Sequence, residues 1–132
     1  MSEHDEQVAV CQYLDLLKIV YCAVPNGGQR HKAVAVKLKM EGVKAGVPDL
    51  LLFTPAGGYR GIAIEMKDVK SGRLSTYQKK WKEDLESCGW LSVVCHGADE
   101  AIKVIKQLYL EGRIDGANND DSRNEQGANR PH

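Results

Sequence analysis

The chain has 132 residues, of which 42% are hydrophobic, and its 18 basic residues balance its 18 acidic residues. A chain of this length is expected to form one domain with its own core. No run approaches the roughly 20 apolar residues that a membrane-spanning helix needs, and the acidic start of the chain is the opposite of a basic secretory signal. Composition therefore argues against a membrane protein, and we expect an intracellular, cytoplasmic one.

The net charge of zero does not favour a nucleic-acid-binding protein, since such domains are usually basic. Positive charge is nevertheless concentrated in residues 30–44, which contain five basic residues and one acid. This window either contacts phosphate groups or is a solvated surface. The four cysteines form no C-x-x-C pair and stand among apolar neighbours, which indicates reduced core cysteines and no structural zinc site. They are Cys11, Cys22, Cys88 and Cys95.

The first half of the chain predicts two helices and a strand. Ser2 can cap a helix that runs to about residue 18. Residues 19–24 are apolar and β-branched, as in a strand, and the Pro-Asn-Gly-Gly sequence at 25–28 ends it. Residues 31–41 predict a second helix, with Val34 and Leu38 facing inward and Gly42 as its terminator.

The second half predicts three strands and two helices. The apolar run 50–53 is typical of a strand buried on both faces, and it forms a hairpin with strand 61–67 through a turn at 55–58. Ser75 and Gln78 form a capping box that opens a helix ending at about residue 87. A strand at 90–95 and an amphipathic helix at 99–110 follow.

The resulting order, α-β-α-β-β-α-β-α, predicts an α/β fold with a central mixed β-sheet flanked by helices. The helix that starts at Ser75 would carry the chain across to the last strand. Residues 1–111 would form this domain. Residues 112–132 are rich in Gly, Asn, Asp and Arg and show no apolar periodicity, so we predict a disordered C-terminal tail.

Three residues of the hairpin suggest chemistry: Asp49 opens its first strand, and Glu65 and Lys67 lie on its second. Side chains alternate along a strand, so Glu65 and Lys67 share a face and Asp49 can project beside them. Two carboxylates about 4 Å apart repel by roughly 4 kcal/mol at an effective dielectric constant near 20. A Mg²⁺ or Mn²⁺ ion would relieve that repulsion and could activate water against a phosphate group.

The same spacing, considered alone, also fits an exposed ion pair between Glu65 and Lys67 on an edge strand. The apolar residues 62–64 favour the catalytic interpretation, because they indicate that Glu65 emerges from a buried strand. A buried carboxylate is costly unless it has a partner.

Several short segments, in this order, resemble a known family. Pro48-Asp49-Leu50, Glu65-Met66-Lys67 and the helix that begins Ser75-Thr76-Tyr77-Gln78 look like the core of the PD-(D/E)XK nucleases. More specifically, Glu6, Pro25-Asn26-Gly27-Gly28 and Gly46-Val47-Pro48-Asp49 are similar to the VRR-NUC domain in its standalone phage or bacterial form. The similarity covers about residues 3–110.

The resemblance implies a divalent-metal-dependent deoxyribonuclease. Asp49, Glu65 and the backbone carbonyl of Met66 would bind Mg²⁺ or Mn²⁺, and Lys67 would orient or deprotonate the attacking water. DNA would be the partner, and we expect no membrane to be involved.

Two further residues carry both a catalytic and a structural interpretation. Glu6 shares the inward stripe of its helix with Val10, within about 40°, and would reach the metal directly or through water. An acid in a first helical turn is also favourable in itself. Gln78 completes the capping box, and the resemblance implies that it also steadies Lys67 or a metal-bound water.

The leading functional interpretation is a structure-selective endonuclease that resolves four-way (Holliday) junctions as a homodimer, as in DNA repair, because standalone VRR-NUC domains resemble junction resolvases. Arg30, Lys32 and Lys44 are the candidates for contacts to DNA phosphates. A monomer that nicks flaps or ends is the alternative with the same chemistry. A non-catalytic nucleic-acid-binding module is an alternative of another class, and a restriction-type enzyme would need extra elements for base contacts.

Overall fold

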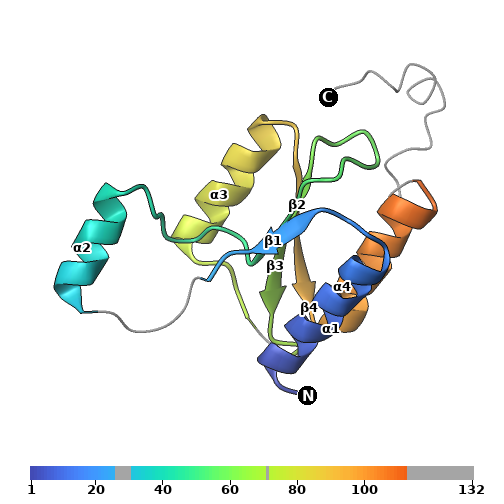
Figure 1. Cartoon of the computed structure of the whole chain (residues 1–132), viewed down its shortest axis with the longest axis horizontal. Coiled ribbons are helices and arrows are strands. Elements are labelled where there is room, and N and C mark those ends of the chain that lie inside the picture. Colours follow the sequence, from blue (N-terminus) through green and yellow to red (C-terminus); the bar gives the residue numbers. More distant parts are fainter. Residues whose placement is uncertain (26–30, 71, 113–132) are drawn as a thin grey trace.

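The computed structural model describes residues 1–25, 31–70 and 72–112, and its elements follow the predicted order (Figure 1). The helices are α1 (Glu3–Leu16), α2 (Lys32–Met40), α3 (Thr76–Ser87) and α4 (Ala98–Ile105), and the strands are β1 (Tyr21–Ala23), β2 (Leu50–Leu52), β3 (Ile62–Lys67) and β4 (Leu91–His96). The single helix expected at 99–110 is instead α4 followed by a π-helical turn, η1 (Lys106–Leu110). Almost all of the predicted tail lies outside the described residues.

The four strands form one mixed sheet in the order β1-β2-β3-β4. The pairs β1–β2 and β2–β3 are antiparallel, whereas β3 and β4 are parallel. A parallel pair needs a crossover connection, and α3 lies in that connection. The predicted α/β fold with an antiparallel hairpin and a crossover helix is therefore confirmed.

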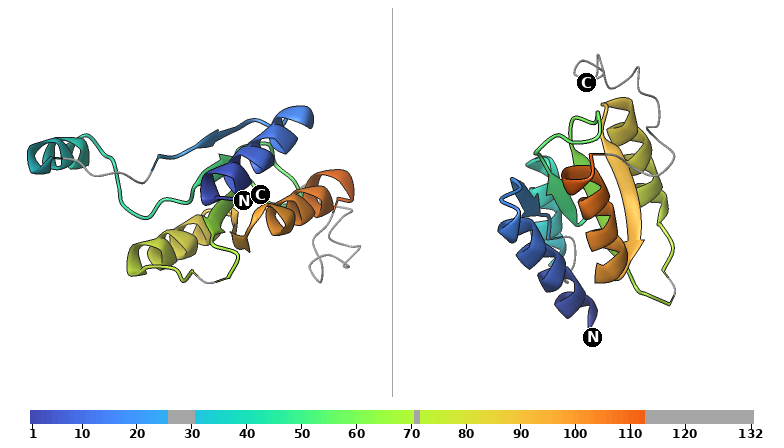
Figure 2. Two further views of the ribbon diagram at one scale, coloured as in Figure 1. Left: turned by 90° about the horizontal axis from the view of Figure 1, so that it is seen from below. Right: turned by 90° about the vertical axis from the view of Figure 1, so that its right-hand side faces the viewer.

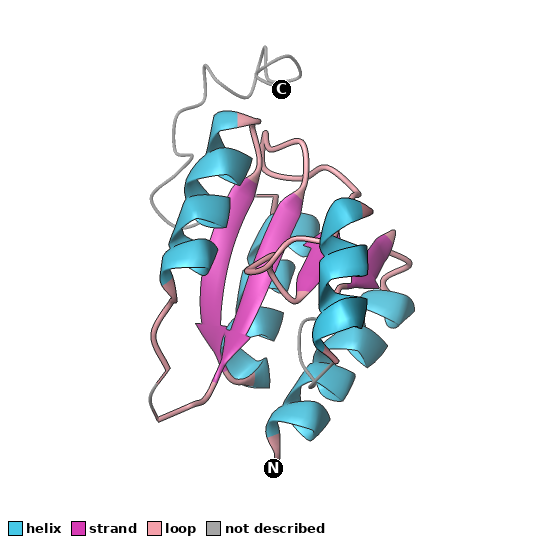
Figure 3. Ribbon diagram, turned by 90° about the vertical axis from the view of Figure 1, so that its left-hand side faces the viewer, coloured by secondary structure: helices cyan, strands magenta, loops and turns pink. Residues whose placement is uncertain are grey.

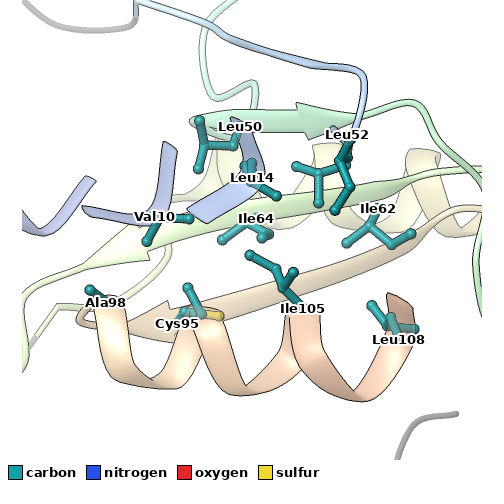
Figure 4. Close-up of a cluster of buried hydrophobic side chains, with 12 residues drawn as sticks. Val10, Leu14, Leu50, Leu52, Ile62, Ile64, Cys95, Ala98, Ile105 and Leu108 are labelled. Carbon is teal, nitrogen blue, oxygen red and sulfur yellow. The ribbon is translucent and has the colours of Figure 1, made fainter. Parts of the chain in front are cut away.

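The helices cover the sheet from both sides. α1 and α4 lie side by side on one face, and α3 lies on the other (Figures 1, 2 and 3). The apolar core fills the space between the sheet and the α1–α4 pair (Figure 4). Its largest fully buried side chains are Leu14, Leu50, Leu52, Ile62, Ile64, Ile105 and Leu108.

Strand alternation separates the core from the polar residues of β3. Ile62 and Ile64 point into the core with no exposed surface (Figure 4), so Glu65, one residue after Ile64, faces the side covered by α3. The register pairs Leu50 with Ile64, and this pairing sets Asp49, the residue before Leu50, opposite Glu65. The sheet thus brings two residues that are 16 positions apart in sequence together at one end of its strands, on the face that α3 covers.

The prediction that Val34 and Leu38 face inward from α2 is wrong for Val34 and only partly right for Leu38. No residue of α2 is buried, and Val34 is 46% exposed. Figure 1 shows the reason, since α2 stands apart from the sheet beyond β1 and α3. The helical pattern gave the correct secondary structure, but no other element of the described chain covers this helix.

The prediction that all four cysteines belong to the core holds only for Cys95, which is buried, and in part for Cys11. Cys22 and Cys88 are exposed, and all four are free thiols. Cys22 lies on the edge strand β1, and Cys88 ends α3 at the surface. Within the described residues, no helix is long and apolar enough to cross a membrane.

Candidate active site

The loop that delivers Asp49 is fastened to α3. The indole Nε1 of Trp81 donates a hydrogen bond to the carbonyl of Ala45 at 3.0 Å. Gly46 follows with φ of +86°, and a Cβ there would lie 2.6 Å from the Cβ of Tyr77. Only glycine allows both that dihedral angle and that approach. The Gly46-Val47-Pro48-Asp49 segment is therefore held against the start of α3, and this contact positions the carboxylate of Asp49.

Asp49 is bound to the strand that carries the second carboxylate. Its Oδ2 accepts a hydrogen bond from the backbone N–H of Met66 at 2.7 Å. Glu65 is 6% exposed, and its Oε2 accepts a hydrogen bond from Nε2 of Gln78 at 2.9 Å. Its other oxygen, Oε1, is buried and has no hydrogen-bond partner among the described residues. A buried carboxylate oxygen without a partner is costly, so this oxygen is a candidate position for a ligand.

Lys67 is held beside this carboxylate by the same glutamine. Its Nζ donates to Oε1 of Gln78 at 3.0 Å and lies 3.7 Å from Oε2 of Glu65. Gln78 Oε1 also accepts from the backbone N–H of Ser75 at 2.8 Å, which completes the capping box of α3. The two interpretations of Gln78 from the sequence are thus compatible, because one side chain caps the helix and bridges Glu65 to Lys67.

The electrostatics of the pair depend on burial. Burial, followed by the negative charge of Asp49, raises the pKa of Glu65 from 4.5 to about 8, although the ammonium of Lys67 opposes the shift. Without a further cation, Glu65 therefore holds a proton over much of the neutral range. This is the behaviour expected of two carboxylates that share one site.

Glu6, on α1, is among the residues that line the same cleft. Its Oε1 accepts a hydrogen bond from the backbone N–H of Ala98 at 2.8 Å, at the first residue of α4. Gly97, with φ of +98°, precedes that residue and lies against Val69 and the carboxylate of Glu6. The carboxylate of Glu6 therefore caps the N-terminus of α4, where negative charge is favourable. It also lies in the first turn of its own helix, α1.

Glu6, Asp49, Glu65 and Lys67 line a cleft of about 530 Å³ at the end of β3. Its walls come from the start of α1, from Asp49 and from residues 65–69 with Gly72 and Arg73. Sequence reasoning missed Arg73, and the signal available for it was a basic residue between Lys67 and the capping box. Arg30 lies outside the described residues, while Lys32 and Lys44 are exposed but do not line this cleft.

The donors in the cleft suit a hard divalent cation. Within the described part of the chain, no group of three or more Asp, Glu, His or Cys side chains stands ready to enclose a metal. Asp49 and Glu65 together supply two carboxylates, one with an unpaired oxygen. A site with few protein ligands leaves positions for water and substrate oxygens, as Mg²⁺ sites that act on phosphates do.

A mixed sheet flanked by helices, with two carboxylates and a lysine at one edge, is consistent with a restriction-endonuclease-like nuclease core. A model of the VRR-NUC domain family matches residues 2–99, so the chain belongs to the VRR-NUC family and carries its nuclease domain. A solved structure described as a VRR_NUC domain protein is similar, with 30% sequence identity and a TM-score of 0.67. That alignment covers 88% of this chain and 94% of the other. No curated protein matches the sequence.

Proposed function

We propose that this nuclease domain is a divalent-metal-dependent DNA endonuclease in which Asp49 and Glu65 hold Mg²⁺ or Mn²⁺. The observation that carries the proposal is the buried Oε1 of Glu65, which has no hydrogen-bond partner in the described part of the chain and stands beside a second carboxylate and a lysine. A bound divalent cation would satisfy that oxygen and offset the repulsion that raises the pKa of Glu65. The backbone carbonyl of Met66 and, through water, the carboxylate of Glu6 are the further ligands that we propose.

Phosphodiester hydrolysis adds water across the bond: the water oxygen bonds to phosphorus, and the sugar oxygen leaves and takes up a proton. The metal, when bound, supplies charge stabilisation and a more acidic water. Lys67 donates to the attacking water or to a non-bridging phosphate oxygen. Gln78, 3.0 Å from the ammonium of Lys67, fixes that donor before substrate arrives. A donor that is already fixed in place stabilises the charge that develops in the transition state more than the same contact would in water.

The substrate that we propose is branched DNA, cut by a homodimer with one catalytic centre on each opposed strand. A twofold dimer matches the symmetry of a four-way junction. The exposed apolar side chains of α2 support the proposal of a protein partner, since Val36 is 55% and Met40 83% exposed. A helix of nine residues is marginal unless other groups pack against it. Arg73 in the cleft, together with Arg30, Lys32 and Lys44, is proposed to contact phosphates.

The enzymatic part of the proposal is tested by incubating supercoiled and branched DNA with the protein in Mg²⁺, Mn²⁺, Ca²⁺ or EDTA. Mg²⁺ and Mn²⁺ should support cleavage. Ca²⁺ should bind without efficient turnover, because its looser coordination positions water poorly. Asp49→Asn should fold, by circular dichroism, and should not cleave. Full activity in excess EDTA would end the metal proposal, and normal turnover by Asp49→Asn would end the assignment of the site.

The assembly and substrate are tested separately. Sedimentation at micromolar concentration should give the mass of a dimer, and Met40→Glu should shift it to a monomer. Lys103→Glu, at an exposed position of α4, which lies far from α2 (Figure 1), is the matched control. A four-way junction labelled on each arm in turn should show paired nicks on opposed strands. A monomer that nicks flaps or ends would replace the resolvase proposal while leaving the nuclease chemistry intact.

A further inference from the structure

A second groove is lined in part by residues 43–46, which lead to Asp49 of the active-site cleft. Its volume is about 740 Å³, within the range of sites that hold small organic groups. Its walls come from α2, from residues 43–46 and from α3, and they combine aromatic, aliphatic and basic side chains. The lining includes Leu38, Lys39, Lys44, Tyr77, Lys80 and Trp81.

Two aromatic rings stand in this groove. Tyr77 is 66% exposed, although α3 packs against the sheet. The indole of Trp81, one helical turn further along α3, is fixed by its hydrogen bond to Ala45. Fixed aromatic faces beside positive charge are the usual means of binding single-stranded nucleic acid, because every base has a face that can stack.

The charges of the groove favour an anion. Three lysines and one carboxylate line it, and the carboxylate, Asp84, forms a salt bridge to Lys80 at 3.0 Å. Lys39 and Lys44 form no salt bridge with any residue that the structure describes. Two uncompensated ammonium groups therefore remain for phosphates, although the chain as a whole is neutral.

The groove is close enough to the cleft to serve the same strand. Gly46 lines the groove and Asp49 lines the cleft. Three residues span at most roughly 11 Å, a distance that a few nucleotides of one DNA strand can bridge. Tyr77 is also the immediate neighbour of Gln78, and successive residues of a helix point about 100° apart. One turn of α3 thus faces the active site with one side chain and the groove with the next.

We infer that this groove binds an unpaired nucleotide of the DNA substrate, its base stacked on Tyr77 and Trp81 and its phosphate held by Lys44 and Lys39. In a duplex the faces of the bases are covered by their neighbours, so only an unpaired or extruded base can enter. The groove thereby selects DNA with unpaired nucleotides within a few steps of the cleaved bond. The inference rests on the proposed function for the identity of the polymer, but not on catalysis.

Binding is measured without cleavage. The chain has two tryptophans, so Trp90→Phe leaves Trp81 as the only indole. Titrating that variant in EDTA with an oligothymidylate of about ten nucleotides should quench its fluorescence. In fluorescence anisotropy with the same oligomer, Tyr77→Ala should weaken binding roughly 5- to 150-fold, and Tyr77→Phe should retain it. Lys44→Ala should reduce the slope of the logarithm of the binding constant against the logarithm of the salt concentration by about one. Lys103→Ala should leave that slope unchanged.

A second measurement connects the groove to selectivity. In Mg²⁺, the preference for a junction that carries unpaired nucleotides over a fully paired junction, measured as a ratio of cleavage rates, should be smaller for Tyr77→Ala than for wild type. An unquenched Trp81, or equal oligothymidylate affinities for wild type and Tyr77→Ala, would overturn the inference. So would a change of sedimentation in Tyr77→Ala, which would make the groove a contact between protein chains. A wild-type protein that binds the oligomer but never cleaves would refute the nuclease proposal alone.

Discussion

Replacing Glu65 by glutamine should stabilise the metal-free protein at high pH while abolishing cleavage. Glutamine has the same shape and can still accept the hydrogen bond that Gln78 gives to Oε2 of Glu65 at 2.9 Å. It removes the negative charge that burial and Asp49 make unfavourable. The protein would thus gain stability from the loss of a residue that its proposed chemistry requires, as expected where function conflicts with stability.

The sign follows from the raised pKa of Glu65, about 8 in the folded protein against 4.5 when unfolded. Between these values the folded state holds a proton that the unfolded state has released, so wild-type stability falls as pH rises and the loss is complete above pH 8. At 1.36 kcal/mol per unit the whole shift corresponds to roughly 5 kcal/mol. Because the open cleft admits screening water, we expect about 2 kcal/mol.

The assay is thermal unfolding of both proteins in EDTA at pH 5 and at pH 9. At pH 9 the Glu65→Gln protein should melt about 8 °C above wild type, and at pH 5 the two should nearly coincide. Mg²⁺ should raise the melting temperature of wild type more than that of the variant. A variant that is less stable than wild type at pH 9, or a difference that does not depend on pH, would refute the reasoning.

Three further predictions concern the supports of the site. Lys67→Ala should retain its fold and its stabilisation by metal, but its cleavage rate should fall at least about 100-fold. The rate is measured as the nicking of supercoiled plasmid, with Lys103→Ala as control. Glu6→Ala should lower the free energy of unfolding by about 1 kcal/mol, since it frees the N–H of Ala98, whereas Glu6→Gln should restore stability without restoring full activity. Gly46→Ala should cost more than about 1 kcal/mol and slow cleavage, because its Cβ would meet Tyr77; unchanged melting and turnover would show that the loop adapts.

Much of the site could be predicted from the sequence because its geometry is local to one hairpin and one helix start. Alternation along β3 fixes that Glu65 and Lys67 share a face, and the Ser75–Gln78 capping box fixes where α3 begins. The antiparallel pairing of β2 and β3 then brings Asp49 to Glu65. The metal that we propose for these carboxylates follows from their chemistry, and the structure adds the unpaired oxygen that fits it.

The sequence by itself determined the order of the elements, the mixed sheet and the face on which the acids stand, because hydrophobic periodicity and caps act within a few residues. Only the tertiary structure decided that Glu6 of α1 binds the start of α4, 92 positions away, that α2 stands clear of the core, and that Tyr77 and Lys44 share a groove. These relations depend on how separate elements pack in space. The local sequence pattern predicts which face of a helix or strand is apolar, but it does not predict which other element will pack against that face.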